Sequence, residues 1–165
     1  MASTLVCVAG KREITPELPI TLAGFGGKQA SRIADPLEVN ALVFRHEGEP
    51  FIFVSSDVLF ISNDVRRRVL EQVRKTEPVA EEHFFWGATH THSAPAVDKV
   101  KKGLGEVQPD YLEFFIEETA GLLIGLLTGP GEPVVVSYVN GKANLAVNRR
   151  KTVWYGSLLH REVRN

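Results

Sequence analysis

The sequence predicts an α/β domain in which helices pack on a mixed β-sheet. Apolar, strand-like runs alternate along the 165 residues with stretches that have the periodicity of an amphipathic helix. A short turn joins two early strand-like runs, whereas helical stretches separate the later ones, so one sheet is expected to contain antiparallel and parallel neighbours. The 44% of hydrophobic and 24% of charged residues are typical of a globular protein. A chain of this length is expected to form a single domain, residues 1–165.

The first third of the chain predicts a strand, a long loop and a β-hairpin. Residues 5–9 are an apolar run of strand length. Residues 16–36 contain three prolines and three glycines, and an irregular connection of this length is often functional. Residues 39–44 and 51–54 are rich in β-branched and aromatic residues, and the turn-forming sequence at 47–50 joins them into a hairpin.

A helix and a further strand are expected next. Ser62 or Asn63 can cap a helix that ends before Pro78 and whose apolar residues recur at helical spacing: Val65, Val69, Leu70 and Val73. Residues 84–87 are an apolar, aromatic run that predicts a buried strand. This order of elements is typical of a strand–helix–strand unit with parallel strands.

The last third predicts a second helix and then weaker elements. The helix is expected to begin at Pro109 and to run through Leu127, because its apolar positions can face a core and the sequence at 129–131 breaks it. Residues 134–139 predict another strand. Beyond Asn140 the pattern weakens, although residues 154–159 indicate one more short element.

Composition and charge argue against several kinds of partner. The net charge is −1 and the basic residues are scattered, apart from three arginines at 66–68, which are expected on the solvated face of a helix. We therefore expect no nucleic-acid partner. The single cysteine, Cys7, excludes an intrachain disulfide and a thiolate zinc cluster, and is expected to be a small buried hydrophobe.

The sequence also carries expectations about membranes and location. No apolar run reaches the ~18 residues of a transmembrane helix, so no transmembrane segment is predicted. The N-terminus lacks the pattern of a signal peptide, because charged residues follow after barely nine positions. A cytoplasmic location is expected unless a signal has been removed.

Two of the five histidines occur in the sequence Thr89-His90-Thr91-His92-Ser93, just after the predicted strand 84–87. In a regular strand His90 and His92 would share one face and could enter one site. Imidazole is the commonest metal ligand, and the neighbouring hydroxyls can hold its free nitrogens. Hydrogen-bonded loop histidines are the alternative, because a catalytic zinc takes three protein ligands and two histidines do not suffice.

Five segments of the chain together form a recognisable pattern: residues 8–16, 22–25, 53–57, 88–95 and 148–150. The strongest is Ala88-Thr89-His90-Thr91-His92-Ser93-Ala94-Pro95. In this order the segments resemble the N-terminal catalytic region of the neutral/alkaline non-lysosomal ceramidase family, whose signature Thr-His-Thr-His-Ser-Gly-Pro is similar to the strongest segment. The chain departs from the family pattern at four positions, where it has Glu13 for aspartate, Ala94 and Ala96 for glycines, and Arg150 for serine.

The resemblance implies the front portion of a larger α/β catalytic domain, and a zinc-dependent amidase that hydrolyses the N-acyl bond of ceramide. His90 matches the family's zinc-binding histidine. His92 matches the histidine that lies beside the metal and contacts the reacting amide, and Arg149 matches the arginine that helps to hold the substrate. The family's other ligands, a histidine, a glutamate and a tyrosine, come from regions further downstream, and His46, His83 and His160 match none of them.

Several alternatives stay open at this point. The chain is either a ceramidase-like hydrolase acting on an N-acyl amide, with its missing zinc ligands supplied by further sequence or by another copy in a homo-oligomer, or a non-catalytic binding or assembly module with the same fold. A small α/β protein with an unrelated ligand is a third reading. Asp57 is either a hydrogen-bond partner of the metal site or a plain loop cap, and without the resemblance Arg149 can also be a surface ion-pairing residue.

Overall fold

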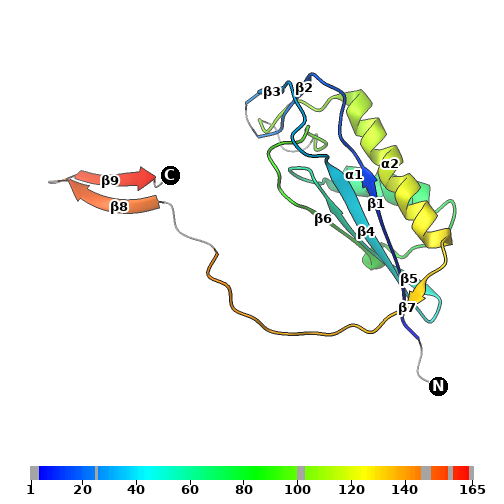
Figure 1. Ribbon diagram of the computed structural model, residues 1–165. Helices are drawn as coiled ribbons and strands as arrows, with labels where there is room; N and C mark the ends of the chain where they lie inside the picture. Colours follow the sequence, from blue (N-terminus) through cyan, green and yellow to red (C-terminus); the bar gives the residue numbers. More distant parts are fainter. Residues whose placement is uncertain (1–3, 25, 100–102, 146–149, 156–157, 164–165) are drawn as a thin grey trace. The chain divides into compact units, whose positions relative to one another are not determined.

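The structure is a computed structural model that describes residues 4–24, 26–99, 103–145, 150–155 and 158–163. Contacts between residues divide the chain into two units, Met1–Val135 and Val136–Asn165. The first unit contains the sheet and both helices (Figure 1). It also contains residues 89–93, which include His90 and His92 and are called the histidine segment below. The second unit contains one hairpin of two strands, β8 (Arg150–Tyr155) and β9 (Leu158–Val163). Each unit is described by itself.

A five-stranded mixed sheet forms the first unit. Its strands, in spatial order, are β6 (Phe84–Ala88), β5 (Glu49–Ser56), β4 (Glu38–His46), β1 (Val6–Glu13) and β7 (Glu132–Pro133). The neighbours β5–β4, β4–β1 and β1–β7 are antiparallel, whereas β5 and β6 are parallel. The prediction of an α/β fold with a mixed sheet is confirmed, and the hairpin predicted around residues 47–50 joins β4 to β5.

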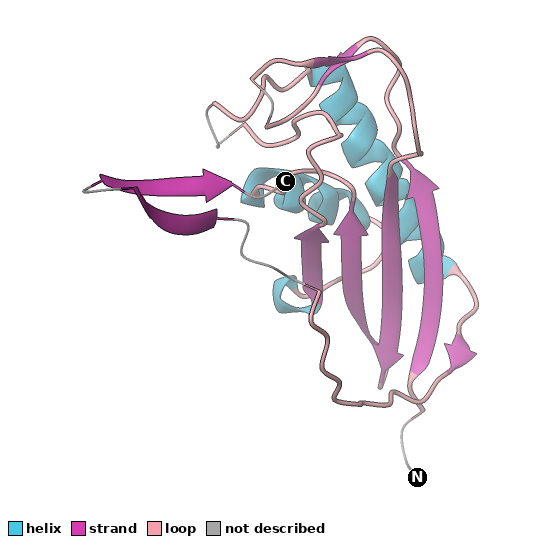
Figure 2. Cartoon of the chain, turned by 60° about the vertical axis from the view of Figure 1, so that its left-hand side comes forward, coloured by secondary structure: helices cyan, strands magenta, loops and turns pink. Residues whose placement is uncertain are grey.

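Two helices cover one face of this sheet, as Figure 2 shows. They are α1 (Asn63–Val73), between β5 and β6, and α2 (Pro109–Thr128), which follows the histidine segment. The Ser62 hydroxyl caps α1 by accepting a hydrogen bond from the backbone N–H of Val65 at 3.4 Å, and proline starts α2. Both predicted helices are confirmed, including the position of the first cap.

The hydrophobic core lies between the helices and the covered face of the sheet. Alternate residues of β4 and β5 point into it, and the helices supply the facing side chains, so the fully buried residues include Val39, Val43, Ile52, Val69, Phe115, Ile116 and Leu123. Each large apolar side chain buried in this way contributes about 1.5–3 kcal/mol. The apolar residues that recur every second position in the strands and every 3.6 positions in the helices therefore pack into one core.

One partly buried ion pair connects the far end of the sheet to the segment after α1 and to the end of α2. The Arg45 guanidinium on β4 donates to both carboxylate oxygens of Glu77 at 2.6 Å and to the Leu127 carbonyl at the end of α2, also at 2.6 Å. The hydrogen bonds from Arg45 lower the pKa of the Glu77 carboxyl below its usual value. A bidentate arginine is suited to this position because its planar fork can bond to two acceptors at once.

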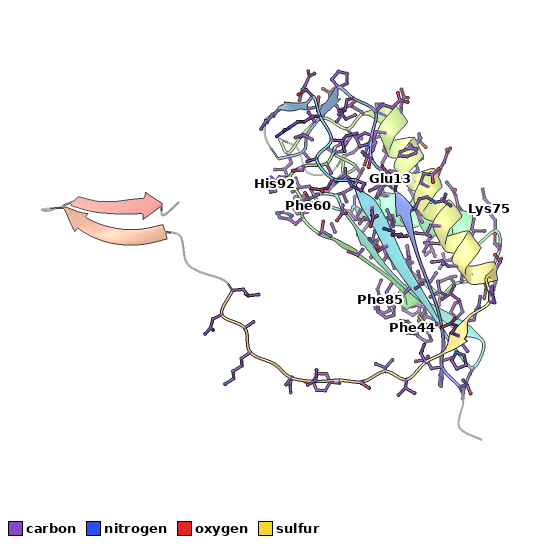
Figure 3. All side chains as sticks on the ribbon, viewed as in Figure 1. Glu13, Phe44, Phe60, Lys75, Phe85 and His92 are labelled. Atoms are coloured by element: carbon purple, nitrogen blue, oxygen red, sulfur yellow. The ribbon has the colours of Figure 1, made fainter. Side chains whose placement is uncertain are left out.

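The other face of the sheet has no helix on it in the described part of the chain. Phe53, Phe85 and Leu42 are 43%, 49% and 40% exposed there, and Figure 3 labels Phe85. The rings of Phe53 and Phe85 stack with a centroid distance of 4.8 Å. Cys7 belongs to this face and is partly exposed, so the prediction of a buried cysteine is wrong. β1 extends to Glu13, beyond the predicted end at residue 9. Charged residues can belong to this strand because the face is open to solvent, where Lys11 bonds to Glu38 of β4.

The strand predicted at residues 134–139 does not form. The segment that begins with β7 pairs antiparallel with β1. This pairing ends where the Val134 N–H donates to the Leu5 carbonyl, close to the beginning of the described chain. Residues 135–139 follow without a strand partner among the described residues, and Val135 and Val139 are 92% and 90% exposed. High β-propensity alone was therefore not sufficient, because no partner strand extends alongside these residues. No helix in the described residues is long and apolar enough to cross a membrane.

The one-sided core makes a testable prediction about two phenylalanines. Phe115 on α2 is fully buried and stacks on Trp86, so Phe115→Ala is expected to lower the free energy of unfolding by about 3–5 kcal/mol. The matched variant Phe53→Ala removes the same group from the open face and is expected to cost about 1 kcal/mol. Urea denaturation followed by circular dichroism measures both, and equal losses would contradict a core on one face.

Candidate functional site

The candidate site lies where the parallel strands β5 and β6 end. Ser56, the last residue of β5, is in register with Ala88, the last residue of β6. The segments that follow the two strands, residues 57–60 and 89–93, therefore leave the same edge of the sheet next to each other. The carboxyl edge of parallel strands is where α/β proteins usually bind ligands. The sequence-based placement of the histidines just beyond a strand is thus confirmed.

Backbone hydrogen bonds fasten the start of the histidine segment to the end of β5. The Thr89 N–H donates to the Ser56 carbonyl at 3.0 Å, and the His90 N–H donates to the Val58 carbonyl at 3.1 Å. The chain turns here: His90 has a φ of 65°, in the left-handed region that non-glycine residues rarely adopt. A conformation of this kind persists only where the surroundings hold it, and these two bonds supply part of that support.

The His90 side chain is oriented by a third carbonyl of the same segment. Its Nδ1 lies 3.0 Å from the Leu59 carbonyl oxygen. Because a carbonyl only accepts, Nδ1 is the donor in this bond, and in a neutral ring the lone pair is then on Nε2. Histidines that bind metals commonly hold their second nitrogen on a backbone carbonyl in this way. The Phe60 ring packs edge-on against the imidazole at 4.8 Å, and His90 itself is exposed.

The two histidine rings meet, although not for the reason that the sequence suggested. β6 ends at Ala88, so His90 and His92 do not share the face of a strand; the turn at His90 brings them together instead. Their ring centroids are 5.2 Å apart, the ring planes are nearly perpendicular (88°), and His92 is half-buried. The two side chains therefore lie together through a turn, and not through the shared face that their spacing would give in a regular strand.

The long loop between β1 and β4 lies against the histidine segment. It is irregular as predicted, apart from two short strands, β2 (Ile20–Thr21) and β3 (Gln29–Ala30). The Ala23 N–H donates to the Ala94 carbonyl at 2.9 Å, and Gly24 touches the His92 ring so closely that an added Cβ would lie 2.3 Å from Nδ1. Glycine is required here for two reasons, because this residue also has a φ of +81°.

A cavity of about 520 Å³ lies between this loop and the histidine segment. Polar groups of the sheet edge line one part of it: Asp57, Thr91 and Ser93. The loop supplies mostly apolar walls, among them Pro16, Leu18, Ile20, Ile33 and Leu37. The loop also contributes polar and charged residues to the lining: Thr15, Lys28, Gln29, Ser31, Arg32 and Asp35. The volume of this mixed cavity is within the range of small-molecule sites.

No protein-family model and no curated protein matches this sequence. Among solved structures, neutral ceramidase from Pseudomonas aeruginosa matches with a TM-score of 0.69 and 19% sequence identity, over 81% of this chain and 23% of that chain. This chain has the fold of a part of neutral ceramidase. A ceramidase complexed with C2 matches similarly, with a TM-score of 0.68 and 20% identity, over 80% of this chain and 22% of that one. The resemblance drawn from the sequence motifs is confirmed at the level of the fold, and the chain spans less than a quarter of the ceramidases that it matches.

The described residues of this ceramidase-like fold bring two histidine rings together. Nδ1 of His90 lies on the Leu59 carbonyl, and the His92 ring packs beside the His90 ring. No group of three or more histidine, cysteine, aspartate or glutamate side chains able to hold a metal occurs in the described ranges. A catalytic zinc takes three protein ligands, so the residues present fit one side of such a site. Arg149, the predicted substrate-binding residue, lies outside the described residues.

The other two histidines of the first unit, His46 and His83, lie outside the histidine segment. His46 is exposed at the end of β4, which is the opposite end of the sheet from the site because β4 runs antiparallel to β5. His83 precedes β6, at the end of a 3-10 turn (Glu81–His83), and stacks on Phe51 with a centroid distance of 4.0 Å. His160 belongs to β9 in the second unit. The sequence analysis missed Gly24 and the Leu59 carbonyl, which both act on the histidine rings; only Gly24 had a signal, in the family-like segment 22–25.

The contact between Gly24 and His92 yields a prediction with a matched control. Gly24→Ala is expected to displace the His92 ring and to lower the free energy of unfolding by about 1–3 kcal/mol, because it adds a clash to the strain of a positive φ. Gly26→Ala has a φ of +61° but meets nothing within 4 Å, so it isolates the strain alone. NMR shifts of the His92 ring and urea denaturation report both effects. The same response in both variants would show that the contact is unimportant.

Proposed function

We propose that this chain carries part of the active site of a zinc-dependent amide hydrolase of the neutral ceramidase type, which acts on an N-acyl amide or a ceramide-like substrate. The observation that carries the proposal is the His90 imidazole, whose Nδ1 is held by the Leu59 carbonyl so that Nε2 is left as a ligand at the carboxyl edge of the sheet. The ceramidase fold and the histidine signature support the same assignment.

In this proposal each predicted residue has a separate role. His90 binds the zinc ion, His92 lies beside the metal and contacts the reacting amide, and Arg149 helps to hold the substrate. When bound, zinc supplies a Lewis acid and lowers the pKa of a water molecule to about 7. A cationic or hydrogen-bonding side chain near the amide carbonyl would stabilise the negative charge that develops on its oxygen.

The cavity next to the histidine segment supports an amphiphilic substrate. Its apolar walls, which include Leu18, Ile20 and Leu37, suit a hydrocarbon chain, and Thr91 and Ser93 offer hydroxyls at the end near the histidines. Its volume of about 520 Å³ is within the usual range for small-molecule sites. The remaining zinc ligands must come from outside the described residues, either from further sequence or from a second copy in a homo-oligomer.

A non-catalytic binding or assembly module is the second candidate, and the open face of the sheet favours it. Leu42, Phe53 and Phe85 are each at least 40% exposed and lie on adjacent strands in register. Contiguous apolar surface of this kind usually marks an interaction site. The presence of only two candidate imidazole ligands among the described residues also agrees with this second function.

Zinc binding separates the two candidates. The hydrolase proposal predicts one zinc ion per chain, and a loss of zinc affinity of more than about 10-fold in His90→Ala, because that variant removes a direct ligand. His46→Ala, at the other end of the sheet, is the matched control and is expected to bind zinc like the wild type. Calorimetric titration measures affinity and stoichiometry, and release of fatty acid from an N-acyl amide measures turnover.

The outcomes are distinct. Zinc binding that His90→Ala abolishes, together with fatty-acid release, supports the hydrolase. Absence of both zinc and turnover at high protein concentration supports the module. Wild-type zinc affinity in His90→Ala would contradict the assignment of His90 as a ligand.

A further inference from the structure

The two carboxylate oxygens of Asp57 accept hydrogen bonds from residues at the ends of two different strands, β4 and β6. It follows directly after β5, whose neighbours in the sheet are β4 and β6. Oδ2 accepts a hydrogen bond from the Glu38 N–H at the start of β4 at 3.1 Å. Oδ1 accepts one from the Thr89 hydroxyl, just beyond β6, at 3.1 Å. The carboxylate therefore reaches across the end of β5 from one neighbouring strand to the other.

The partners of this side chain explain why it is an acid. An ionised carboxylate only accepts hydrogen bonds, and it faces one N–H and one O–H donor. Hydrogen bonds to an ionised acceptor are stronger than those between neutral groups. The Asp57 backbone N–H donates to the Glu38 carbonyl at 2.9 Å, so the residue is anchored to β4 by two bonds, one from its backbone and one to its side chain. The bond to Thr89 then connects the histidine segment to this anchored point.

Asp57 completes a continuous set of bonds from residues 56–59 to residues 89–90. The carbonyls of Ser56 and Val58 hold the backbone N–H groups of Thr89 and His90, and the Leu59 carbonyl holds the His90 ring. Asp57 adds a bond to a side chain of this pair, because its carboxylate accepts from the Thr89 hydroxyl. Without that bond the peptide before His90 can rotate more freely, and the left-handed turn at His90 loses a support.

We infer that Asp57 is a positioning residue, which acts through Thr89 to fix the direction of the His90 imidazole. The inference rests on the proposed function for the role of His90, and it goes beyond it by assigning a role to Asp57, whose carboxylate accepts hydrogen bonds from Glu38 and Thr89. It also decides between the two interpretations of Asp57 left open by the sequence, in favour of a part of the site rather than a plain loop cap. Residues that orient metal ligands usually affect metal affinity by about 10–100-fold.

A double-mutant cycle tests the inference. Asp57→Ala and Thr89→Val each break the bond between the two side chains, and Thr89→Val leaves the bond from Asp57 to Glu38 intact. Each variant is expected to weaken zinc binding by about 10-fold and to raise the hydrogen-exchange rate of the His90 amide by a similar factor. The double variant is expected to lose no more than either single variant, because both remove the same connection.

Three further variants separate positioning from general stability. Asp57→Asn keeps an acceptor for Glu38 and can donate to the Thr89 oxygen, so it is expected to restore most of the zinc affinity. Asp64→Ala and Thr128→Val remove the same groups elsewhere, from a surface ion pair on α1 and from the end of α2, and are expected to leave the His90 amide unchanged. NMR exchange at single-residue resolution and calorimetric zinc titration are the two readouts.

Different results would overturn different statements. Additive effects in the double variant, or a lower free energy of unfolding in Asp57→Ala with unchanged His90 exchange and zinc affinity, would show that Asp57 is only a loop cap. If the wild type binds no zinc, the proposed function fails. The exchange rate of the His90 amide still decides in that case whether Asp57 and Thr89 position this residue.

Discussion

The parallel pairing of β5 with β6 is the constraint on which the candidate site depends. Because Ser56 and Ala88 are in register, the chain that leaves β5 runs beside the chain that leaves β6. Three successive residues after Ser56 can then bond to Thr89 and His90 with a carboxylate, a backbone carbonyl and a second carbonyl. No other pairing in the described sheet brings two strand ends together at one edge in this way, since the remaining neighbours are antiparallel.

The rest of the first unit supports this edge from one side. Helix α1 connects the two parallel strands, and α2 packs across β1 and β4, so the strands that carry the site pack one of their faces into the core. The Tyr111 hydroxyl on α2 donates to the Ile14 carbonyl at 2.9 Å, where the long loop begins, and burial raises the pKa of this phenol above its usual value. A loop with irregular backbone is thereby held on a rigid scaffold, which is how functional loops are commonly arranged.

Much of this architecture followed from local sequence patterns, and the exceptions have physical reasons. The hairpin and both helices were predicted because periodicity and turn or capping residues agree within each segment. The prediction of a strand at 134–139 was wrong because a strand needs a partner, and the pairing with the chain before β1 ends at Leu5. The proximity of His90 and His92 was predicted, but the turn that produces it was not, since backbone carbonyls such as that of Leu59 leave no signal in a sequence. The contact between Gly24 and His92 joins distant segments and needed the three-dimensional structure.

The central claim is that the sheet edge fixes the His90 ring with its Nε2 atom free to bind a metal. The most direct measurement is the tautomer of this ring in the metal-free protein, observed in long-range ¹H–¹⁵N NMR spectra at about pH 8. The account predicts a proton on Nδ1, shared with the Leu59 carbonyl, and an unprotonated Nε2. A proton found on Nε2, or rapid exchange between both tautomers, would contradict it.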